Sequence, residues 1–292
     1  MIHAVQTFGL ILVELLVLFS LISVLVALVN RRFGPDRIQS WMADGRLPGP
    51  LKGLLLGAIT PFCSCSTLPV LAGMLKSGVA FRTSMTFLIS SPLLDPIIVA
   101  GVVLLFDWRI ALVYTVVTAA WSLLAPLVWE RLGMASQLKR VKVVGDDSTP
   151  HPWAGLRNEI RPALGEAWAD LRPLLVPMVL GVSVGAFIYG FVPQDQLAAV
   201  AGDDKPWAVP LAAVLGVPLY VRIETMLPIG LALSSTGMGL GAVFALMIGG
   251  AGASIPEISM LTTLFKPRLV VTFVVTVIGT AIAAGYLIPL IA

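Results

Sequence analysis

Charge is the scarcest property of this chain. Of its 292 residues only 19 are Lys or Arg and 16 are Asp or Glu. Charged residues therefore make up 12%, against about a quarter in ordinary soluble domains. Hydrophobic residues make up 58%, and the mean hydropathy is +0.95. This composition excludes an ordinary soluble globular protein and predicts an all-α integral membrane protein.

Several recognisable sequence features are also missing. No Gly-x-x-x-x-Gly-Lys-Ser/Thr loop occurs, so this chain is not expected to hydrolyse ATP. No thioredoxin-like module and no quinone or haem signature is found, and neither a cofactor nor a metal site is expected. The N-terminal residues lack the charged start and the cleavage site of a signal peptide, so residues 8–29 are predicted to be a retained span.

Six stretches are long and apolar enough to cross a hydrocarbon core, which takes about 20 apolar residues. They are residues 8–29, 83–106, 110–129, 173–193, 240–265 and 269–291. Two further apolar stretches, 53–75 and 207–234, are interrupted by prolines. These helix-breaking residues are Pro61 and Pro69 in the first stretch and Pro218 and Pro228 in the second. Proline removes a helical hydrogen bond, so each stretch is predicted to be a pair of half-helices, either re-entrant or discontinuous.

The chain contains two similar halves. Pro69 and Pro228 lie 159 positions apart, and the same offset relates other residues. These pairs are Gly57 and Gly216, Leu68 and Leu227, Gly78 and Gly237, Phe106 and Phe265, and Arg109 and Arg268. The order of apolar elements repeats as well, which predicts two membrane repeats, residues 1–130 and 173–292, joined by residues 131–172. Duplications of this kind are common in transporters.

Lys and Arg in the loops predict the orientation, because they favour the cytoplasmic side. Residues 30–52 and 131–172 are rich in both and are expected to be cytoplasmic. The second-half equivalent of the first basic loop, residues 194–206, holds three Asp and one Lys and is expected outside. Equivalent loops on opposite sides predict an inverted repeat in a bacterial cytoplasmic (inner) membrane, with both termini outside. The alternative is that the interrupted stretches cross fully, which gives eight spans.

Residues 131–172 form the one sizeable polar segment. Near its end the apolar residues recur at three- and four-residue intervals among charged residues. They are Ile160, Leu164, Ala167, Trp168 and Leu171. This pattern predicts an amphipathic helix along the membrane interface, so we expect a linker and not a catalytic domain. The sequence pI of about 9.0 comes from such loops and suits anionic lipid, not nucleic acid.

Both cysteines of the chain, Cys63 and Cys65, lie in the first interrupted stretch, where Gly53 to Leu75 contains no charged residue. Alternate residues share a face on extended backbone but point about 200° apart on a helix. Unwound backbone would therefore present both sulfurs to one thiophilic ligand, such as a trivalent arsenical or a monovalent copper ion. We expect a substrate site here that includes Ser64 and Ser66. The alternative is that the cysteines only fill apolar space.

At the equivalent break of the second half, the offset places Arg222, Glu224 and Thr225 at the positions of Cys63, Cys65 and Ser66. A central charge costs about 2.5 to 3.5 kcal/mol on insertion scales, so such charges normally pair and mark a pathway. We expect these three residues to form the other wall of the substrate site, where Arg222 would attract an anion. The alternative is that the two charges only neutralise each other.

Two further acids lie in predicted spans beside prolines. They are Asp95, which precedes Pro96, and Glu257, which follows Pro256. Together with Glu224 they are candidates for carrying protons across the membrane. The alternative for both is a structural role in which the acid caps free backbone amides at a kink.

Three short motifs resemble a known family. They are Thr-Pro-Phe-Cys-Ser-Cys-Ser at residues 60–66, Ser-Ser-Pro at 90–92 and Ser-Ile-Pro-Glu at 254–257. The chain closely resembles, over about residues 50–290, the predicted permease family that includes ArsP-type organoarsenical efflux permeases and YraQ-type permeases. The resemblance implies permease activity, with Cys63 and Cys65 in contact with a thiophilic substrate. The second break reads Val-Arg-Ile-Glu-Thr where relatives often have small residues, which allows a charged substrate.

The rival function is a membrane-embedded thiol/disulfide oxidoreductase that uses Cys63 and Cys65. A disulfide between residues i and i+2 would be strained and easily reduced. The missing redox modules favour the permease, which is not an enzyme. Its expected partners are the lipid bilayer and a small-molecule or ion substrate, with no nucleic acid. A homodimer is one further alternative. Transport would be passive, ion-coupled or driven by a separate subunit.

Overall fold

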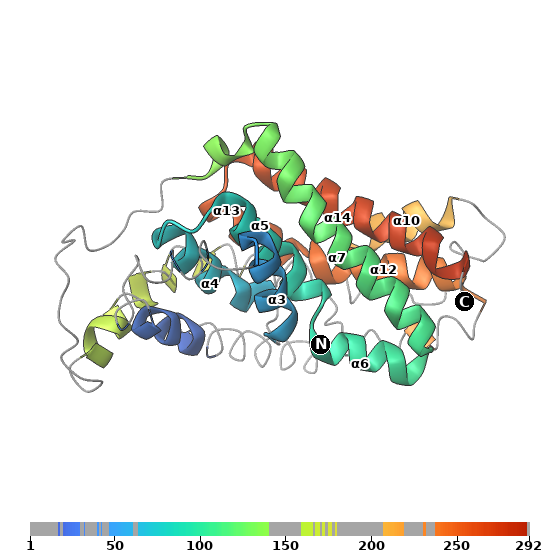
Figure 1. The fold of residues 1–292 in the computed structure, drawn as a ribbon, viewed down its shortest axis with the longest axis horizontal. Helices are drawn as coiled ribbons and strands as arrows, with labels where there is room; N and C mark the ends of the chain where they lie inside the picture. The colour runs from blue at the N-terminus through green and yellow to red at the C-terminus, as the bar shows by residue number, and fades with distance from the viewer. Residues whose placement is uncertain are drawn as a thin grey trace.

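The computed structural model describes residues 47–60, 64–139, 207–218 and 237–290, together with 20–29, most of 159–172 and a few single positions. In these parts of the chain the named elements are all helices, and an isolated antiparallel bridge pairs Leu138 with Phe265 (Figure 1). The helices are α3 (Gly49–Ile59), α4 (Ser64–Lys76), α5 (Phe81–Leu93), α6 (Pro96–Leu105), α7 (Trp108–Arg131), η1 (Met134–Gln137), α10 (Ala208–Gly216), α12 (Leu240–Gly252), α13 (Ile255–Leu264), α14 (Pro267–Leu287) and η2 (Ile288–Leu290). The predicted all-α class is confirmed.

Four helical segments of the described chain are long and apolar enough to span a membrane. They are Phe81–Leu105, Trp108–Arg131, Leu240–Leu264 and Pro267–Leu290. They correspond to four of the six predicted full spans. Of the remaining two predictions, 173–193 lies largely outside the described residues. The second half of 8–29 is described, and there Ser20–Val29 forms a short apolar helix.

Two of the four spans are interrupted, at places where the sequence suggested a kink as one alternative but not a break between two helices. The first divides into α5 and α6 at Asp95, and the third divides into α12 and α13 at Ser254. Prolines cause both interruptions. Pro96 and Pro256 lie in the first turn of the second helix, where proline is tolerated. They have no N–H to continue the hydrogen bonds of the helix before them.

The prolines of the two interrupted stretches behave differently from one another. Pro69, predicted at a break, lies inside α4 as its sixth residue. Its missing N–H deprives only the carbonyl of Cys65, near the start of the helix, so Pro69 is not a helix break. Pro218 follows the end of α10, and the residues after it lie outside the described part of the chain. Pro61 and Pro228 lie outside the described residues.

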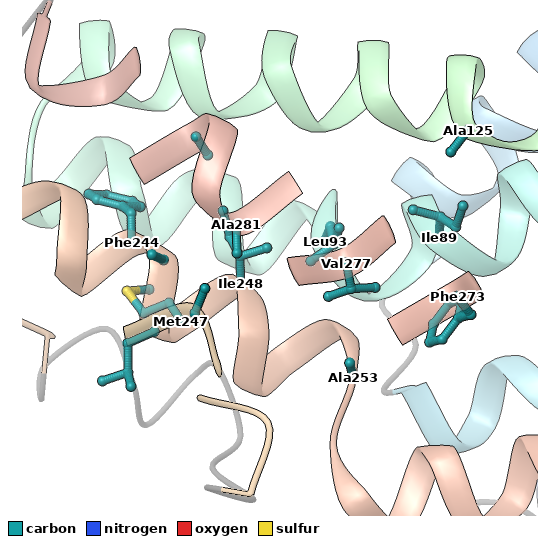
Figure 2. Packing of buried hydrophobic residues seen from close by; sticks show 14 of the residues in the cluster. Ile89, Leu93, Ala125, Phe244, Met247, Ile248, Ala253, Phe273, Val277 and Ala281 are labelled. Atoms are coloured by element: carbon teal, nitrogen blue, oxygen red, sulfur yellow. The ribbon is translucent and has the colours of Figure 1, made fainter. Parts of the chain in front are cut away.

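Helices α5 and α12 form the centre of the described bundle. All residues of α5 from Thr83 to Leu93 are buried, and α12 is buried almost throughout. The long helices α7 and α14 cross them on one side (Figure 1). Figure 2 shows Leu93, Ile248 and Val277 from three of these helices gathered in one apolar cluster. The core therefore joins elements from both halves of the chain.

The same close packing occurs once in each half. A Cβ atom at Gly57 of α3 would collide with the Ser90 hydroxyl of α5. A Cβ atom at Gly216 of α10 would lie 2.8 Å from the Gly250 amide nitrogen of α12. Small residues allow membrane helices to approach at backbone distance. Glycine is therefore required at both positions, which are 159 residues apart.

The 159-residue offset also relates the bounds of the elements. Adding 159 to the bounds of α5 and α6 gives those of α12 and α13. The same shift converts Trp108–Arg131 into Pro267–Leu290. Gly78 and Gly237 both have positive φ, 72° and 98°, three residues before α5 and α12. Only glycine adopts this conformation readily, so each half enters its central helix through the same turn.

One end of the bundle, which we call the basic end, collects the starts of α3, α5 and α14 and the ends of α4, α7 and α13. A Cβ atom at Gly49 would lie 2.6 Å from Thr83 Oγ1, which places the start of α3 beside that of α5. Arg82 at the start of α5 forms an ion pair with Glu130 at the end of α7. The amide of Lys139 donates to the Leu264 carbonyl at 2.8 Å, and that of Lys266 donates to Gln137 at 2.9 Å. These contacts make α7 and α14 antiparallel neighbours.

The opposite end of the bundle collects the starts of α7, α10 and α12 and the ends of α6 and α14. A Cβ atom at Gly285 of α14 would lie 2.5 Å from Val209 Cγ1 of α10. The rings of Phe106, after α6, and Phe244, near the start of α12, have centroids 5.1 Å apart. Helices that correspond by the 159-residue offset therefore point in opposite directions.

Hydroxyl side chains in the spans bond within their own helices. Thr118 Oγ1 donates to the Tyr114 carbonyl at 2.7 Å, and Ser122 Oγ donates to the Thr118 carbonyl at 2.7 Å. Thr276 donates to Thr272 in the same way at 2.8 Å. Bonds of this type satisfy a hydroxyl without a partner from another helix. These residues are therefore compatible with an apolar environment.

The end of the central linker contains helix, as predicted. Residues 159–165, 167–169 and 171–172 are helical. Ala163, Ala167 and Leu171 are buried, whereas the remaining large apolar side chains of the pattern are exposed. These exposed side chains are Ile160, Leu164 and Trp168.

Candidate functional site

The interruptions of the two spans are in contact. Leu93 is the last residue of α5, and Gly252 is the last residue of α12. A Cβ atom at Gly252 would lie 3.2 Å from Leu93 Cδ2. Each helix has 13 residues and is about 20 Å long, and the two start from opposite ends of the bundle. In a hydrocarbon core of about 30 Å, both breaks therefore lie near the middle.

At the first break, side chains form hydrogen bonds with the backbone groups that have lost their helical partners. Asp95 Oδ1 accepts the Ile97 amide at 2.8 Å, which caps the start of α6. The Tyr114 hydroxyl of α7 donates to the Leu93 carbonyl at 2.6 Å. Asp95 is buried, with 8% of its surface exposed. Its geometry fits the structural alternative, in which the acid caps backbone amides at a kink.

The second break presents different side chains on a similar backbone. Ser254 occupies the N-cap of α13 but makes no side-chain cap bond. Its hydroxyl is buried and has no hydrogen-bond partner among the described residues. Glu257 lies in the first turn of α13 and is fully buried. A carboxyl group and a hydroxyl therefore lie within one turn of each other at the middle of the bundle.

In the first half, the gap between α3 and α4 also lies near these two breaks. Helix α3 ends at Ile59, and α4 begins at Ser64. Thr67 Oγ1 in α4 bonds Ser91 Oγ in α5 at 3.2 Å, with both residues buried. Helix α4 also packs against α13, and both run from the middle toward the basic end. Their first turns, which contain Cys65 and Glu257, therefore lie at a similar depth.

The predicted substrate residues are only partly described. Ser64, Cys65 and Ser66 form the first turn of α4. The sequence predicts extended backbone at Cys65, but the helix begins before it, because no proline between Pro61 and Pro69 prevents a helical turn. The other predicted residues, which are Cys63, Arg222, Glu224 and Thr225, lie outside the described residues. Their roles stay predictions.

Sequence reasoning gave no role to four residues that line the breaks. They are Thr67, Ser91, Tyr114 and Ser254. Each is a polar residue within an apolar run, which is the available sequence signal. Within the described parts of the chain, no group of three His, Cys, Asp or Glu residues is arranged to hold a metal ion.

Comparison with known proteins places almost the whole chain in a family of predicted permeases. Residues 1–290 match the ArsP-type family described as predicted permease. The UPF0718 protein YcgR of Bacillus subtilis is 22% identical over 276 residues, which cover 92% of each chain. The UPF0718 protein YraQ of Escherichia coli is 23% identical over 245 residues, which cover 84% of this chain and 69% of YraQ.

A third relative, from Streptococcus mutans, is named as a subunit of a two-component membrane permease complex. It is 24% identical over 272 residues, which cover 91% of this chain and 88% of the relative. No solved structure matches the chain significantly.

Proposed function

The chain belongs to the ArsP-type family of predicted permeases, and we propose that it moves a small solute through a site at the bilayer centre where its helix breaks meet. The observation that carries this proposal is the contact between Leu93 and Gly252, each at the end of a half-helix. Broken helices in transporters commonly build the substrate site at the midplane. Irregular backbone at that depth is tolerated only where it is buried or lines a cavity.

The permease is built, in this proposal, from two inverted repeats. Three observations support it: the 159-residue offset between element bounds, the paired glycine turns, and the opposite directions of corresponding helices. Helix α3 starts at the basic end and α4 returns to it, which favours a re-entrant pair over a full crossing. Two such halves can rock around a fixed central site.

The basic end faces the cytoplasm in this proposal. Seven described Lys and Arg residues of the spans and their short loops lie there. They are Lys52, Lys76, Arg82, Arg131, Lys139, Lys266 and Arg268, against Arg109 at the opposite end. The positive-inside tendency then supports the predicted orientation in a bacterial cytoplasmic membrane.

A thiophilic solute is the first substrate class, with a trivalent organoarsenical as the example. Cys63 and Cys65 would supply sulfur, and α4, whose first turn contains Cys65, packs against α13. Arg222, Glu224 and Thr225 would supply the second wall from the equivalent break. Asp95, Glu224 and Glu257 are the acids that would couple proton movement to transport, with Glu257 favoured by its complete burial.

A small anion is the second substrate class, and a specific observation favours it. Three described half-helices, α4, α6 and α13, begin near the middle of the bundle. The N-terminus of a helix carries a partial positive charge, which attracts anionic groups in transporters. Arg222 would add a full charge.

Flux into sealed proteoliposomes tests the function and separates the two classes. We expect wild-type protein to move a trivalent alkyl arsenical, and Cys63→Ser or Cys65→Ser to slow this flux at least about tenfold, which corresponds to loss of about 1.4 kcal/mol of binding. Met74→Leu, which removes a buried sulfur elsewhere in α4, is the matched control. Unchanged arsenical flux in both Cys variants would exclude sulfur ligation. Phosphate or chloride flux that is lost in Arg222→Gln would identify an anion permease instead.

The proton role of Glu224 is tested in the same vesicles. Glu224→Gln should remove the dependence of flux on a pH gradient. Retained transport with an unchanged pH dependence would exclude Glu224 from the proton path.

A further inference from the structure

Helix α5 carries many hydroxyl side chains, whereas the corresponding helix of the second half carries none. Five of its 13 residues are Ser or Thr, and all five are buried. They are Thr83, Ser84, Thr86, Ser90 and Ser91. Helix α12, which occupies the equivalent position, has no Ser or Thr. Of the two helices that lead from the ends of the bundle to the central breaks, only the one from the basic end therefore offers hydroxyls along its length.

The side of α5 that contains Ser84 and Ser91 lies against α4. Ser91 Oγ accepts a hydrogen bond from Thr67 Oγ1 of α4 at 3.2 Å, with both residues buried. Ser84 precedes Ser91 by seven residues, about two helical turns, so both lie on the same side of α5. They are about 10 Å apart along the helix axis. The two hydroxyls therefore connect the depth of the breaks with that of the basic end.

The hydroxyl of Ser84 differs from those of α7 and α14 in its hydrogen bonding. Every Ser and Thr hydroxyl of α7 and α14 donates to the carbonyl four residues before it. Ser84 Oγ is fully buried and has no hydrogen-bond partner in the described part of the chain. Buried polar atoms are almost always bonded. Ser84 therefore keeps a hydrogen-bonding capacity that water or a solute can use when α4 and α5 separate.

The other sides of α5 face different neighbours. Thr86 is also buried with no hydrogen-bond partner among the described residues, but it lies about 200° around the helix from Ser84. It shares its side of α5 with Ser90, whose hydroxyl would collide with a Cβ atom at Gly57 of α3. Ile89 lies in the apolar cluster shown in Figure 2. These residues provide comparisons at nearly the same depth as the two serines.

We propose that the side of α5 marked by Ser84 and Ser91 lines the solute path between the central breaks and the basic end. Helix α4 covers this side in the structure, so the path is closed at the basic end in this state. When α4 moves away, the two hydroxyls bind water and the polar groups of the solute. Residues 64–75 of α4 and 83–93 of α5 include no charged residue, so this path offers hydroxyls and suits uncharged polar groups. The proposal rests on the permease function, because the path serves its solute.

Reactivity of single cysteines tests the path on the full-length protein in lipid nanodiscs. Both native cysteines are replaced by serine, and the probe is methyl methanethiosulfonate, which is small and uncharged. It reacts with thiolates, which form in water and not in apolar packing. Ser84→Cys and Ser91→Cys should both react. The matched controls Thr86→Cys and Ile89→Cys should react at least about tenfold more slowly, because opening at α4 does not wet their sides of α5.

Three outcomes of the labelling would show that the proposal is wrong. The first is that neither Ser84→Cys nor Ser91→Cys reacts faster than its control. The second is that Ser84→Cys alone reacts, which would mean a shallow cleft that does not reach the breaks. The third is that the controls react equally fast, because the water would then not be confined to the side facing α4.

Flux of a trivalent alkyl arsenical into proteoliposomes is the second measurement, and it decides the matter if a cysteine variant does not fold. Ser84→Ala should slow this flux about threefold to tenfold, because the solute loses a hydrogen bond on its path. Thr86→Ala should leave flux unchanged. A purely structural Ser84 predicts instead that Ser84→Ala has wild-type flux and an equal or higher midpoint of thermal unfolding, because alanine removes a buried hydroxyl that has no partner.

The two measurements also separate this proposal from the permease function. Labelling does not require transport, so unreactive cysteines in a protein that moves solute would leave the permease function standing and place the path elsewhere. Absence of flux of any solute in the wild type would remove the permease function, whereas labelling would still decide whether water reaches the side of α5 that faces α4.

Discussion

Leu93 and Gly252 occupy the same position in the two halves of the chain, and they touch. A Cβ atom at Gly252 would lie 3.2 Å from Leu93 Cδ2. In the proposed inverted repeat, equivalent residues can contact each other only when they lie close to the axis that would relate the two halves. The two interruptions are neighbours, and under this proposal a movement of one half against the other would act on both breaks at once.

The proposed orientation predicts labelling from opposite sides of the membrane. In a Cys63→Ser, Cys65→Ser background, Asp107→Cys should react with an impermeant maleimide added to intact cells. Ser136→Cys, at the basic end, should react only after the membrane is opened. Both positions are exposed, so both should label fully in opened membranes, which is the control. Labelling of both variants in intact cells would contradict the opposite placement of these two loops.

The close approach of α3 to α5 and of α10 to α12 predicts a loss of stability in Gly57→Ala and Gly216→Ala. Each new Cβ atom would meet backbone or side-chain atoms of the facing helix. Overpacking of this kind costs about 1–3 kcal/mol, which exceeds the gain of about 1 kcal/mol from replacing glycine by alanine in a helix. Chemical or thermal unfolding in nanodiscs measures the difference.

Gly165→Ala is the matched control for this pair. Gly165 is helical and exposed, and nothing lies within 4 Å of a Cβ atom there. The substitution should leave stability unchanged or raise it slightly through helix propensity. Equal stability of all three variants would mean that the glycines are not needed for packing.

The turns at Gly78 and Gly237 predict that substitution of either glycine lowers the stability of the protein by a similar amount. Both have positive φ, and the space around Gly237 is open, so backbone strain is the main cost of a side chain there. Alanine should cost about 1–2 kcal/mol at each position, and asparagine should cost less because it tolerates this conformation. Thermal unfolding of the four variants checks the order. A loss at one position alone would contradict a shared turn.

The hydrogen bond between Tyr114 and the Leu93 carbonyl predicts a modest loss of stability in Tyr114→Phe. The donor and acceptor are 2.6 Å apart and buried. Hydrogen bonds between membrane helices average about 0.6 kcal/mol and reach about 1.7 kcal/mol, so we expect a loss within this range. Thr272→Val, whose lost hydroxyl bonds only within α14, is the control and should cost less. A fully stable Tyr114→Phe would show that the Leu93 carbonyl finds another donor.

The sequence predicted the helical class, four of the spans and the glycine pairs, because hydropathy and a constant offset are visible along one chain. It did not predict the breaks at Asp95 and Ser254, since the apolar runs continue through both and hydropathy does not distinguish a break from a kink. The bond from Tyr114 to Leu93 joins residues on different helices and has no local signal. Cys65 was expected in extended backbone, but α4 begins before it.

The bridge between Leu138 and Phe265 has a further consequence. It joins the first residues after η1 to the turn between α13 and α14 by two backbone bonds, at the basic end that also holds the Arg82 and Glu130 ion pair. The first residues of the linker, which follow the first half directly, are thus hydrogen-bonded to the second half. A chain cut between residues 140 and 158 would keep these two backbone bonds. The two halves, expressed as separate polypeptides, should therefore associate in the same membrane.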